Sequence, residues 1–382
     1  MKIELHMLQN FAPSCLNRDD SNAPKDCEFG GYRRARISSQ CLKRATRQHP
    51  LFAEIVGSAP GIRTRRLISE VAQGLVDKGM DEQGAEQAAS AVVTLLVGKK
   101  SSDGRTAVAF YCSPEEIQRI IEATYDARQE LSEGGDGAKA KKSREKAAKE
   151  LAKALTKEFR TSAAAADVAL FGRMVAERTD LNIDAACQVA HAISTNRAAM
   201  EMDFFTAVDD LQPEEEPGAG MMGTVEFNSS CFYRYAMVDL PQLKENLADD
   251  AELATRTVEA FLRASVAAIP TGKQNSMAAQ NPPACVLAVV RRSGMPWSLA
   301  NAFERPVMPP QRADQSLTSL SLKALDSYWG QLTKMYGTEG IAAAAVCCLG
   351  EPELEHLTCH AVADVESVFR AVIEAISADG GE

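Results

Sequence analysis

The sequence predicts an α+β fold built on the element order strand, helix, strand, strand, helix, strand. Residues 2–7 alternate polar and apolar side chains, which is the period of a strand with one wet face. A capped helix follows over 38–49, and β-branched and aromatic stretches cover 202–208 and 224–238. A second helix and the apolar run 285–290 complete the order. This is the ferredoxin-like arrangement that RNA-recognition folds share, although a fold does not by itself define a function.

The first predicted helix has clear boundaries. Ser38 or Ser39 can cap its start, and Pro50 stops it after His49. Residues from about 62 to 180 are then Ala-rich with helical spacing and almost no strand signal, so we interpret them as a helical insertion. Within the insertion, residues 132–149 contain glycines and many charges, which predicts a mobile loop leading into a solvated helix.

The second half of the chain predicts a long hairpin and a second amphipathic helix. The two β-rich stretches flank a Pro, Gly and Glu segment over 212–223, which indicates an extended hairpin tip. The helix has apolar residues at helical spacing over 258–269 and ends at Pro270. Further on, the sequence shows helical stretches over 322–335 and 362–376 and an apolar run over 341–349, but it does not place them.

Composition describes an ordinary globular protein. The 382 residues are 45% hydrophobic, enough to bury a sizeable core as one elaborated domain or as two. No run of eighteen apolar residues occurs and the N-terminus lacks a signal-peptide pattern, so we expect a cytoplasmic protein without a membrane partner. The ten cysteines contain no CxxC pair, which favours reduced thiols over a disulfide framework or a zinc ribbon.

Charge is distributed unevenly along the chain. The net charge of -10 argues against a nucleic-acid partner, but Arg18 to Arg47 holds eight basic residues against four acids. That stretch is +4 and the remainder is -14. The asymmetry predicts either one anion-binding face on an acidic particle or a merely solvated helix face.

The sharpest local pattern lies on the first helix. Gln40, Lys43, Arg44 and Arg47 are spaced i, i+3, i+4 and i+7, so they share one face, while Leu42 and Ala45 can turn inward. Such a row matches a run of phosphates, and each phosphate neutralised on a single strand steepens the log-log salt dependence by about 0.7. The helix N-terminus at Ser38 and Ser39 can bind a phosphate or serve as a simple cap.

Several segments resemble one known family. PSCLNRDD (13–20) and KDCEFGGYRRARISSQCLKRA (25–45) are similar to the opening of CasC, the backbone subunit of the type I-E CRISPR Cascade complex. FGRM (171–174), QVAHAISTN (188–196), DFFTAVDDLQ (203–212), GTVEFNSSCFYRYA (223–236) and SLANAFE (298–304) extend the resemblance over most of residues 1–305. The segment from about 51 to 165 and the C-terminal part match only loosely.

The resemblance implies a hand-like subunit with a modified RNA-recognition (ferredoxin-like) palm, a helical fingers insertion and a β-hairpin thumb. The corresponding divisions are 1–61 and 181–305 for the palm, 62–180 for the fingers, 202–238 for the thumb within the second palm part, and 306–382 for a C-terminal palm or helical part. Copies would stack along the CRISPR guide RNA, together with other Cascade subunits. The guide would pair with target DNA, and a nuclease-helicase would be recruited indirectly.

The resemblance also implies particular contacts to the guide. The palm residues facing the RNA backbone would be Arg18, Arg34, Ser38, Gln40, Lys43, Arg44 and Arg47. Met174 would pack against bases, and the thumb would wedge a displaced nucleotide with Phe204, Phe205, Thr206 and Met222. Neighbouring strand residues point to opposite faces, so we expect only one phenylalanine to be the wedge and the other to face the core. Lys273 and Gln274 lie in TGKQN, a loop expected near nucleic acid or the next subunit, which lacks the spacing of a P-loop.

Three other interpretations compete with this one. Type III backbone subunits cleave RNA through a palm-loop aspartate, so Asp19, Asp20 and Asp26 make a metal-dependent ribonuclease the alternative function. His356, Cys359 and His360 could hold a metal, although a packed or solvated cluster is the simpler interpretation. The third is an oligomerising protein without RNA. We assign no catalytic residue, metal or cofactor.

Overall fold

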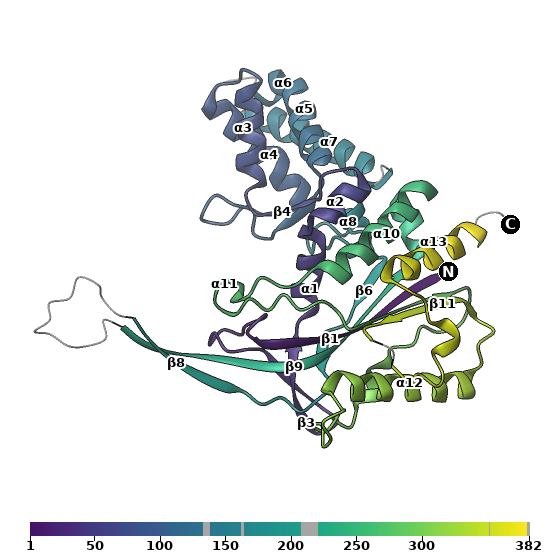
Figure 1. The fold of residues 1–382 in the computed structure, drawn as a ribbon. Helices are drawn as coiled ribbons and strands as arrows, with labels where there is room; N and C mark the ends of the chain where they lie inside the picture. Colours follow the sequence, from purple (N-terminus) through teal and green to yellow (C-terminus); the bar gives the residue numbers. More distant parts are fainter. Residues whose placement is uncertain (133–137, 162–163, 208–220, 351, 380–382) are drawn as a thin grey trace, which may run out of the picture. The chain divides into compact units, whose positions relative to one another are not determined.

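The computed structural model describes residues 1–132, 138–161, 164–207, 221–350 and 352–379 (Figure 1). The chain divides into two compact units. We call Met1–Phe52, Gln188–Val238 and Glu259–Glu382 the sheet unit, and Ala53–Cys187 with Asp239–Val258 the helical unit. None of the described helices combines the length and the apolar character needed to cross a bilayer.

The strands of the main sheet are β1 (Lys2–Ser14), β2 (Asp26–Phe29), β3 (Tyr32–Ile37), β6 (Cys187–Val189), β7 (Ala192–Ser194), β8 (Glu201–Ala207), β9 (Met221–Asp239), β10 (Cys285–Arg291) and β11 (Ile341–Cys348). Their order is β11-β10-β1-β9-β7-β3-β2, with β6 and β8 paired to β9. The central path β10-β1-β9-β7 is the fourth, first, third and second strand of a ferredoxin-like sheet. The predicted α+β fold, with an RNA-recognition-like palm, is therefore confirmed.

One strand assignment was wrong. The stretch over 202–208 was expected to be the second strand of the core sheet, but β7 holds that position and pairs with both β3 and β9. β8 instead pairs with the first residues of β9, from Glu201 opposite Phe227 to Ala207 opposite Met221. The nineteen-residue β9 thus serves two sheets: its far half is buried in the core, and its near half forms a projecting hairpin (Figure 1).

Helices cover both faces of the central strands. Leu8, Leu287 and Val289 point to one face, where they pack with Leu325 and Trp329 of α12 (Leu317–Tyr336). On the other face lie α1 (Ser39–Gln48), the second half of α10 (Ala251–Ala267) and α13 (Val365–Asp379). Every residue of β10 is buried as a result. The C-terminal stretches that the sequence did not place thus complete the core of the sheet unit.

A buried polar network ties β1 to the loop after β10. Glu4 forms an ion pair with Arg291 and accepts from the backbone N–H of Trp297 at 3.1 Å. The hydroxyl of Tyr233 accepts from the N–H of Leu299 at 2.8 Å and lies 2.8 Å from Nδ1 of His6. These contacts offset part of the desolvation of the four buried side chains. The network holds the start of η2 (Leu299–Phe303), the SLANAFE segment, against the sheet.

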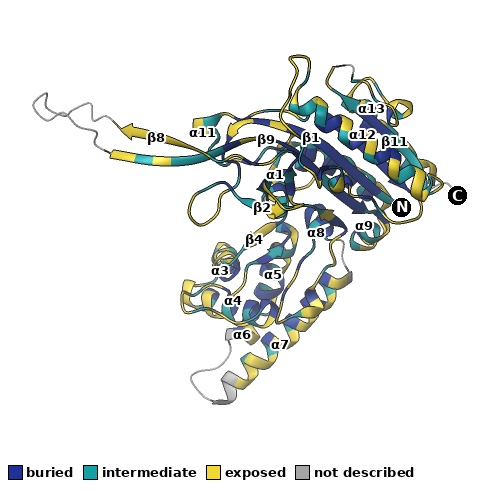
Figure 2. Cartoon of the chain, turned by 90° about the horizontal axis from the view of Figure 1, so that it is seen from below, coloured by how far each residue is buried: buried dark blue, intermediate teal, exposed yellow. Residues whose placement is uncertain are grey.

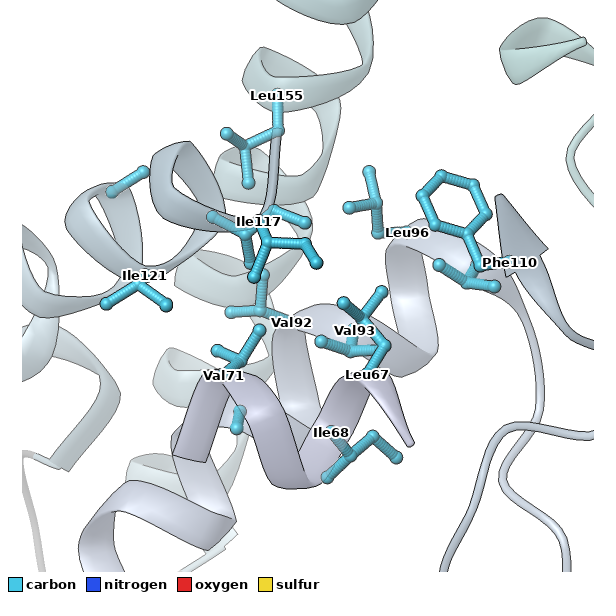
Figure 3. Close-up of a cluster of buried hydrophobic side chains, with 14 of the residues drawn as sticks. Leu67, Ile68, Val71, Val92, Val93, Leu96, Phe110, Ile117, Ile121 and Leu155 are labelled. Atoms are coloured by element: carbon cyan, nitrogen blue, oxygen red, sulfur yellow. The ribbon is translucent and has the colours of Figure 1, made fainter. Parts of the chain in front are cut away.

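The helical unit has its own core. Its elements are α2 (Pro50–Val56, shared with the sheet unit), β4 (Ile62–Thr64), α3 (Leu67–Asp77), α4 (Glu82–Val97), β5 (Phe110–Cys112), α5 (Pro114–Asp126), α6 (Arg128–Ser132), α7 (Ala138–Thr161), α8 (Ala166–Phe171), η1 (Thr179–Leu181) and α9 (Leu240–Asn246). Figure 3 shows Val71, Val92, Leu96 and Ile117 converging between α3, α4 and α5. The predicted helical character of 62–180 is present, with the short β4–β5 pair added.

Some local expectations needed revision, and parts of others fall outside the described residues. The segment before the first helix, in which the sequence predicted no strand, contains the β2–β3 hairpin. Pro50 begins α2 as well as ending α1, because proline is accepted in a first helical turn. The solvated helix expected after the charged loop is α7, whereas residues 133–137 of that loop lie outside the described residues. Of the hairpin tip expected over 212–223, residues 212–220 also lie outside them, whereas residues 221–223 belong to β9.

Candidate nucleic-acid interface

Helix α1 presents its polar face to solvent as the sequence indicated, but the row is not uniform. Leu42 and Thr46 are buried, so the face directly opposite carries Gln40, Arg44 and Gln48, all exposed. Lys43 and Arg47 lie along its flank and are half-buried. Arg44 is therefore the most exposed cation of the row.

The start of α1 is organised by three acceptors. Ser38 is the N-cap, and its hydroxyl accepts from the N–H of Cys41 at 3.3 Å. Oδ1 of Asn17 accepts from the N–H of Ser38 at 2.9 Å, and Nδ1 of His191 lies 3.2 Å from the N–H of Ser39. The capping role allowed for Ser38 is confirmed, while a phosphate contact from Ser38 stays a prediction.

His191 is an unforeseen member of this site. Its Nδ1 also lies 3.2 Å from a guanidinium nitrogen of Arg36, so two donors converge on one imidazole nitrogen. Partial burial, followed by the charges of Arg36 and Lys25, lowers the pKa of His191 below 6.5. The N–H groups of Arg36 and Ser39 can only donate, so Nδ1 of His191 is the acceptor for both. A neutral ring leaves Nδ1 free of hydrogen for this role, whereas a protonated ring does not.

Arg18 lies in a polar turn beside the helix start. It donates to Oδ1 of Asn22 at 2.6 Å, while Oδ1 of Asp19 accepts from Ser21 and from the N–H of Ala23 at 3.0 Å. The hydrogen bonds from Ser21, with that from Ala23, hold the pKa of Asp19 below its usual value. A cavity of about 500 Å³ opens here, and its lining includes Arg18, Cys41, Thr271 and Gly272. The fold thus brings the Arg18 turn, α1 and the TGKQN loop together.

The TGKQN loop is pressed onto the end of β1. A side chain at Gly272 would collide with the carbonyl oxygen of Leu16, so only glycine fits. The side-chain amide of Gln274 donates to the carbonyls of Pro270 at 3.1 Å and Ala279 at 3.3 Å, which makes it an internal brace. Lys273 is half-buried with a left-handed backbone (φ 52°). Contacts from Lys273 and Gln274 to nucleic acid stay predictions.

Arg34 does not belong to the solvent-facing set in which the sequence placed it. Its side chain is 0% exposed, and its guanidinium donates to the carbonyls of Ser194, Thr195, Phe303 and Glu304 at 2.7 to 3.1 Å. Gly30, at φ 61°, lies so close to Glu304 that a side chain there would collide with its carbonyl oxygen. Arg34 therefore fastens the β2–β3 hairpin to the chain around η2 instead of facing a phosphate.

The hairpin separates the four predicted thumb residues. Directly opposed residues of an antiparallel pair share a face, so Phe204, Thr206 and Met222 lie on one side together with Thr224. Phe204 is 62% exposed and Met222 is 67% exposed, and the whole of β8 is drawn as exposed in Figure 2. Phe205 points to the other side, where its ring lies over Gly223 and is 37% exposed. Neither ring enters the core, contrary to expectation, because the pair β8–β9 projects beyond it.

Met174 lies in the helical unit on a firmly held segment. The preceding Arg173 is buried, pairs with Glu116 at 2.8 Å and stacks on Phe110, with 5.0 Å from the guanidinium to the ring centre. Met174 itself is 82% exposed. Base packing by Met174 stays a prediction.

Helix α7 carries a row of exposed cations that a count of charges does not reveal. Lys142, Lys146, Lys149, Lys153, Lys157 and Arg160 are all exposed and repeat at intervals of three or four residues, so they line one face of the helix. Their spacing is visible in the sequence, but intervening acids such as Glu150, which pairs with Lys146, mask it in a charge count. The helical unit thus carries a basic face of its own.

The residues considered for a ribonuclease site and for a metal site make contacts within the fold. Asp19 accepts within its own turn, and Asp26 pairs with Arg33. His356 packs against Gly330, and His360 lies edge-on to Trp329 with 6.2 Å between ring centres. Within the described ranges, no three His, Cys, Asp or Glu side chains are grouped to hold a metal ion.

Comparison with known proteins covers nearly the whole chain. A family model described as CT1975-like protein matches residues 3–375. A solved structure described as "CRISPR RNA-guided surveillance complex, pre-nicking" is 30% identical with a TM-score of 0.82, covering 98% of this chain and 100% of that chain. A second, described as "CRISPR RNA-guided surveillance complex", is 26% identical with a TM-score of 0.71 and the same coverage. No curated protein matches.

The carbonyl cage of Arg34 predicts a strong contrast between neighbouring arginines. Arg34→Met leaves four carbonyls without their donor, so the free energy of unfolding should fall by about 3 kcal/mol. Arg33→Met removes an ion pair whose arginine is 60% exposed and should cost less than about 1 kcal/mol. Urea denaturation of both variants measures the difference, and equal losses would contradict the structural role of Arg34.

The donors around His191 predict its titration. Its ring should titrate by NMR with a midpoint below 6.5, and Arg36→Gln should raise that midpoint by removing one of the charges that lowers the pKa. Because the folded pKa lies below the unfolded one, the contact with Ser39 favours folding at neutral pH and is lost as pH falls through the lowered pKa. A midpoint at or above 6.5 would exclude the neutral acceptor.

Proposed function

This chain belongs to the CT1975-like protein family, and we propose that it is a non-catalytic backbone subunit that oligomerises along CRISPR guide RNA in a type I-E Cascade complex. The guide is held there for pairing with target DNA in antiviral defence. The observation that carries the proposal is the likeness over 98% of the chain, at 30% identity, to a chain of an RNA-guided surveillance complex.

The exposed chemistry of the sheet unit supports phosphate contacts at its rim. Both faces of β1 and β10 are occupied by helices, so RNA cannot lie across these strands as it does on an open RNA-recognition sheet. The available groups are Arg18, Gln40 and Arg44, with Lys43 and Arg47 beside them. Long cationic and amide side chains suit a ribose-phosphate backbone and carry no base code. Recognition of sequence would then be delegated to pairing by the guide.

The hairpin supports the second half of the proposal. An exposed aromatic ring next to two flexible apolar side chains can stack on any base, since every base has a π face. Phe204, with Met202 and Met222 on the same side, provides such a surface. We assign the wedge to this side and a bracing role to Phe205.

The remaining parts of the proposal rest on the sequence resemblance. They are the type I-E class, assembly of several copies on one guide, association with other Cascade subunits, indirect recruitment of a nuclease-helicase and a cytoplasmic location. The non-catalytic role is supported by the engagement of Asp19 and Asp26 in local contacts. If the protein were instead a ribonuclease, it would cleave complementary RNA at a defined position in the presence of Mg²⁺, and Asp26→Ala would abolish that cleavage.

Charge reversal on α1 tests the phosphate contacts. The double variant Lys43→Glu/Arg47→Glu should lose RNA-bound assembly in cells, and in vitro its log-log salt slope on single-stranded RNA should fall by about 1.4, for two phosphates. Lys323→Glu/Arg370→Glu makes the same charge change at exposed positions of α12 and α13 and serves as the control. If both double variants weakened RNA binding equally, net charge alone would explain the effect, and specific phosphate contacts from α1 would be excluded.

Separate truncation of the two phenylalanines tests the hairpin. Phe204→Ala should weaken binding of guide RNA by the assembled complex by about 1 to 3 kcal/mol per copy, the worth of one stacked base. Phe205→Ala removes the ring over Gly223 and should act mainly on hairpin order. Filter binding combined with fluorescence of 2-aminopurine placed along the guide distinguishes the two. A larger binding loss for Phe205→Ala would reverse the assignment.

A further inference from the structure

Two cysteines face each other across the last two strands of the sheet. Cys285 of β10 and Cys348 of β11 are directly opposed in antiparallel register. The N–H of Leu349 donates to the carbonyl of Ala284 at 2.8 Å, one residue outside the pair. This places the cysteines at a non-hydrogen-bonded position, where opposed Cα atoms are about 4.5 Å apart and side chains are closest. That separation lies within the range that a disulfide spans.

The two thiols already interact. The hydrogen bond with Cys348, followed by burial, raises the pKa of the Cys285 thiol, and the same hydrogen bond lowers the pKa of Cys348. Cys285 is 2% exposed, whereas Cys348 is half-buried. The adjacent Cys347 points to the opposite face, where its sulfur lies 4.0 Å from the carbonyl of Ala363. The pair therefore combines a sheltered thiol with a more accessible one that has greater thiolate character.

A cavity reaches the pair at Cys285. It has a volume of about 570 Å³ and is lined by Cys285, Leu349 and residues at the start of α12, including Ser319 and Leu322. Leu349, which follows Cys348, is itself 70% exposed. A small reagent can therefore reach Cys285 through the cavity, while the half-buried Cys348 is itself partly open to solvent.

We propose that Cys285 and Cys348 form a redox modification site, in which a small-molecule disulfide of the glutathione class converts them into a cross-strand disulfide. The Cys348 thiolate attacks one sulfur of the reagent, forming a mixed disulfide and releasing one reagent thiolate, which takes up a proton. Cys285 then loses its proton to solvent and attacks the Cys348 sulfur, releasing the second reagent thiol. Two protein thiols are oxidised and one reagent disulfide is reduced to two thiols.

The modification would act on the edge of the sheet. β11 is the outermost strand on this side, and α13 packs against β10 and β11. A bond between the strands would fasten this edge strand, and with it the path to α13, to the central sheet. The site lies on β10 and β11 and does not involve α1 or the hairpin, so it is independent of the function proposed above.

Peptide mapping of the full chain tests the proposal. The protein is incubated with oxidised glutathione, remaining thiols are blocked with N-ethylmaleimide, and peptides are analysed by mass spectrometry without reduction. A linked Cys285–Cys348 peptide that disappears on treatment with dithiothreitol is expected. Its absence from wild-type protein in which other cysteines carry glutathione adducts would overturn the proposal without reliance on any variant.

Three serine variants determine the order of steps and the register. Cys285→Ser should accumulate glutathione on Cys348, and Cys348→Ser should lose both the linked peptide and most of the adduct at Cys285. Cys347→Ser, next in sequence but on the other face, should give the linked peptide as the wild type does. Adduct formation on Cys285 in Cys348→Ser at the level seen on Cys348 in Cys285→Ser would overturn the assigned attack. Loss of the linked peptide in Cys347→Ser would overturn the pairing.

Discussion

Burial of both faces of the central strands is the constraint on which the rest of the sheet unit depends. β1 and β10 lie between α12 with its Trp329 on one side and α1, α10 and α13 on the other. Removing this much apolar surface from water provides the main driving force for folding. It also closes the sheet surface that an open RNA-recognition fold offers to nucleic acid. A nucleic acid bound by the sheet unit would then meet helix α1, the adjoining loops and the projecting hairpin instead of the sheet face.

Several loops of the sheet unit are held in place by buried or turn-forming polar side chains that form hydrogen bonds with backbone groups. Arg34 donates to four carbonyls, and the buried Asp326 of α12 accepts from the N–H groups of Glu355, His356 and Leu357. Asp19 and Gln274 do the same for their own turns. Such groups are costly to bury and costlier to leave unpaired, so they define single loop conformations. The exposed cations beside them are then presented from an ordered rim.

The hairpin follows different physics. Its strand β8 is exposed along its full length (Figure 2). Two strands alone bury little, so apolar residues on both sides stay in contact with water. Exposed methionine and phenylalanine side chains that lie together are typical of an interaction surface. The register determines what each side can do, since it groups Phe204 with Met222 and sets Phe205 over Gly223.

Local patterns in the chain were sufficient for the long helices, for strands β1, β8, β9 and β10, for a cap of α1 at Ser38 or Ser39 and for the fold class, because periodicity and capping depend on near neighbours. They were also sufficient for the basic face of α1. They failed where distant segments decide the outcome. In the sequence, Arg34 looks like one more cation of YRRAR, and only the folded chain surrounds it with the carbonyls near Ser194 and Phe303. The core strand β7 was missed in favour of β8 because a strand of three residues carries almost no sequence signal. His191 and the opposition of Cys285 to Cys348 belong to the same class, since strand register and loop docking arise only when the chain packs against itself.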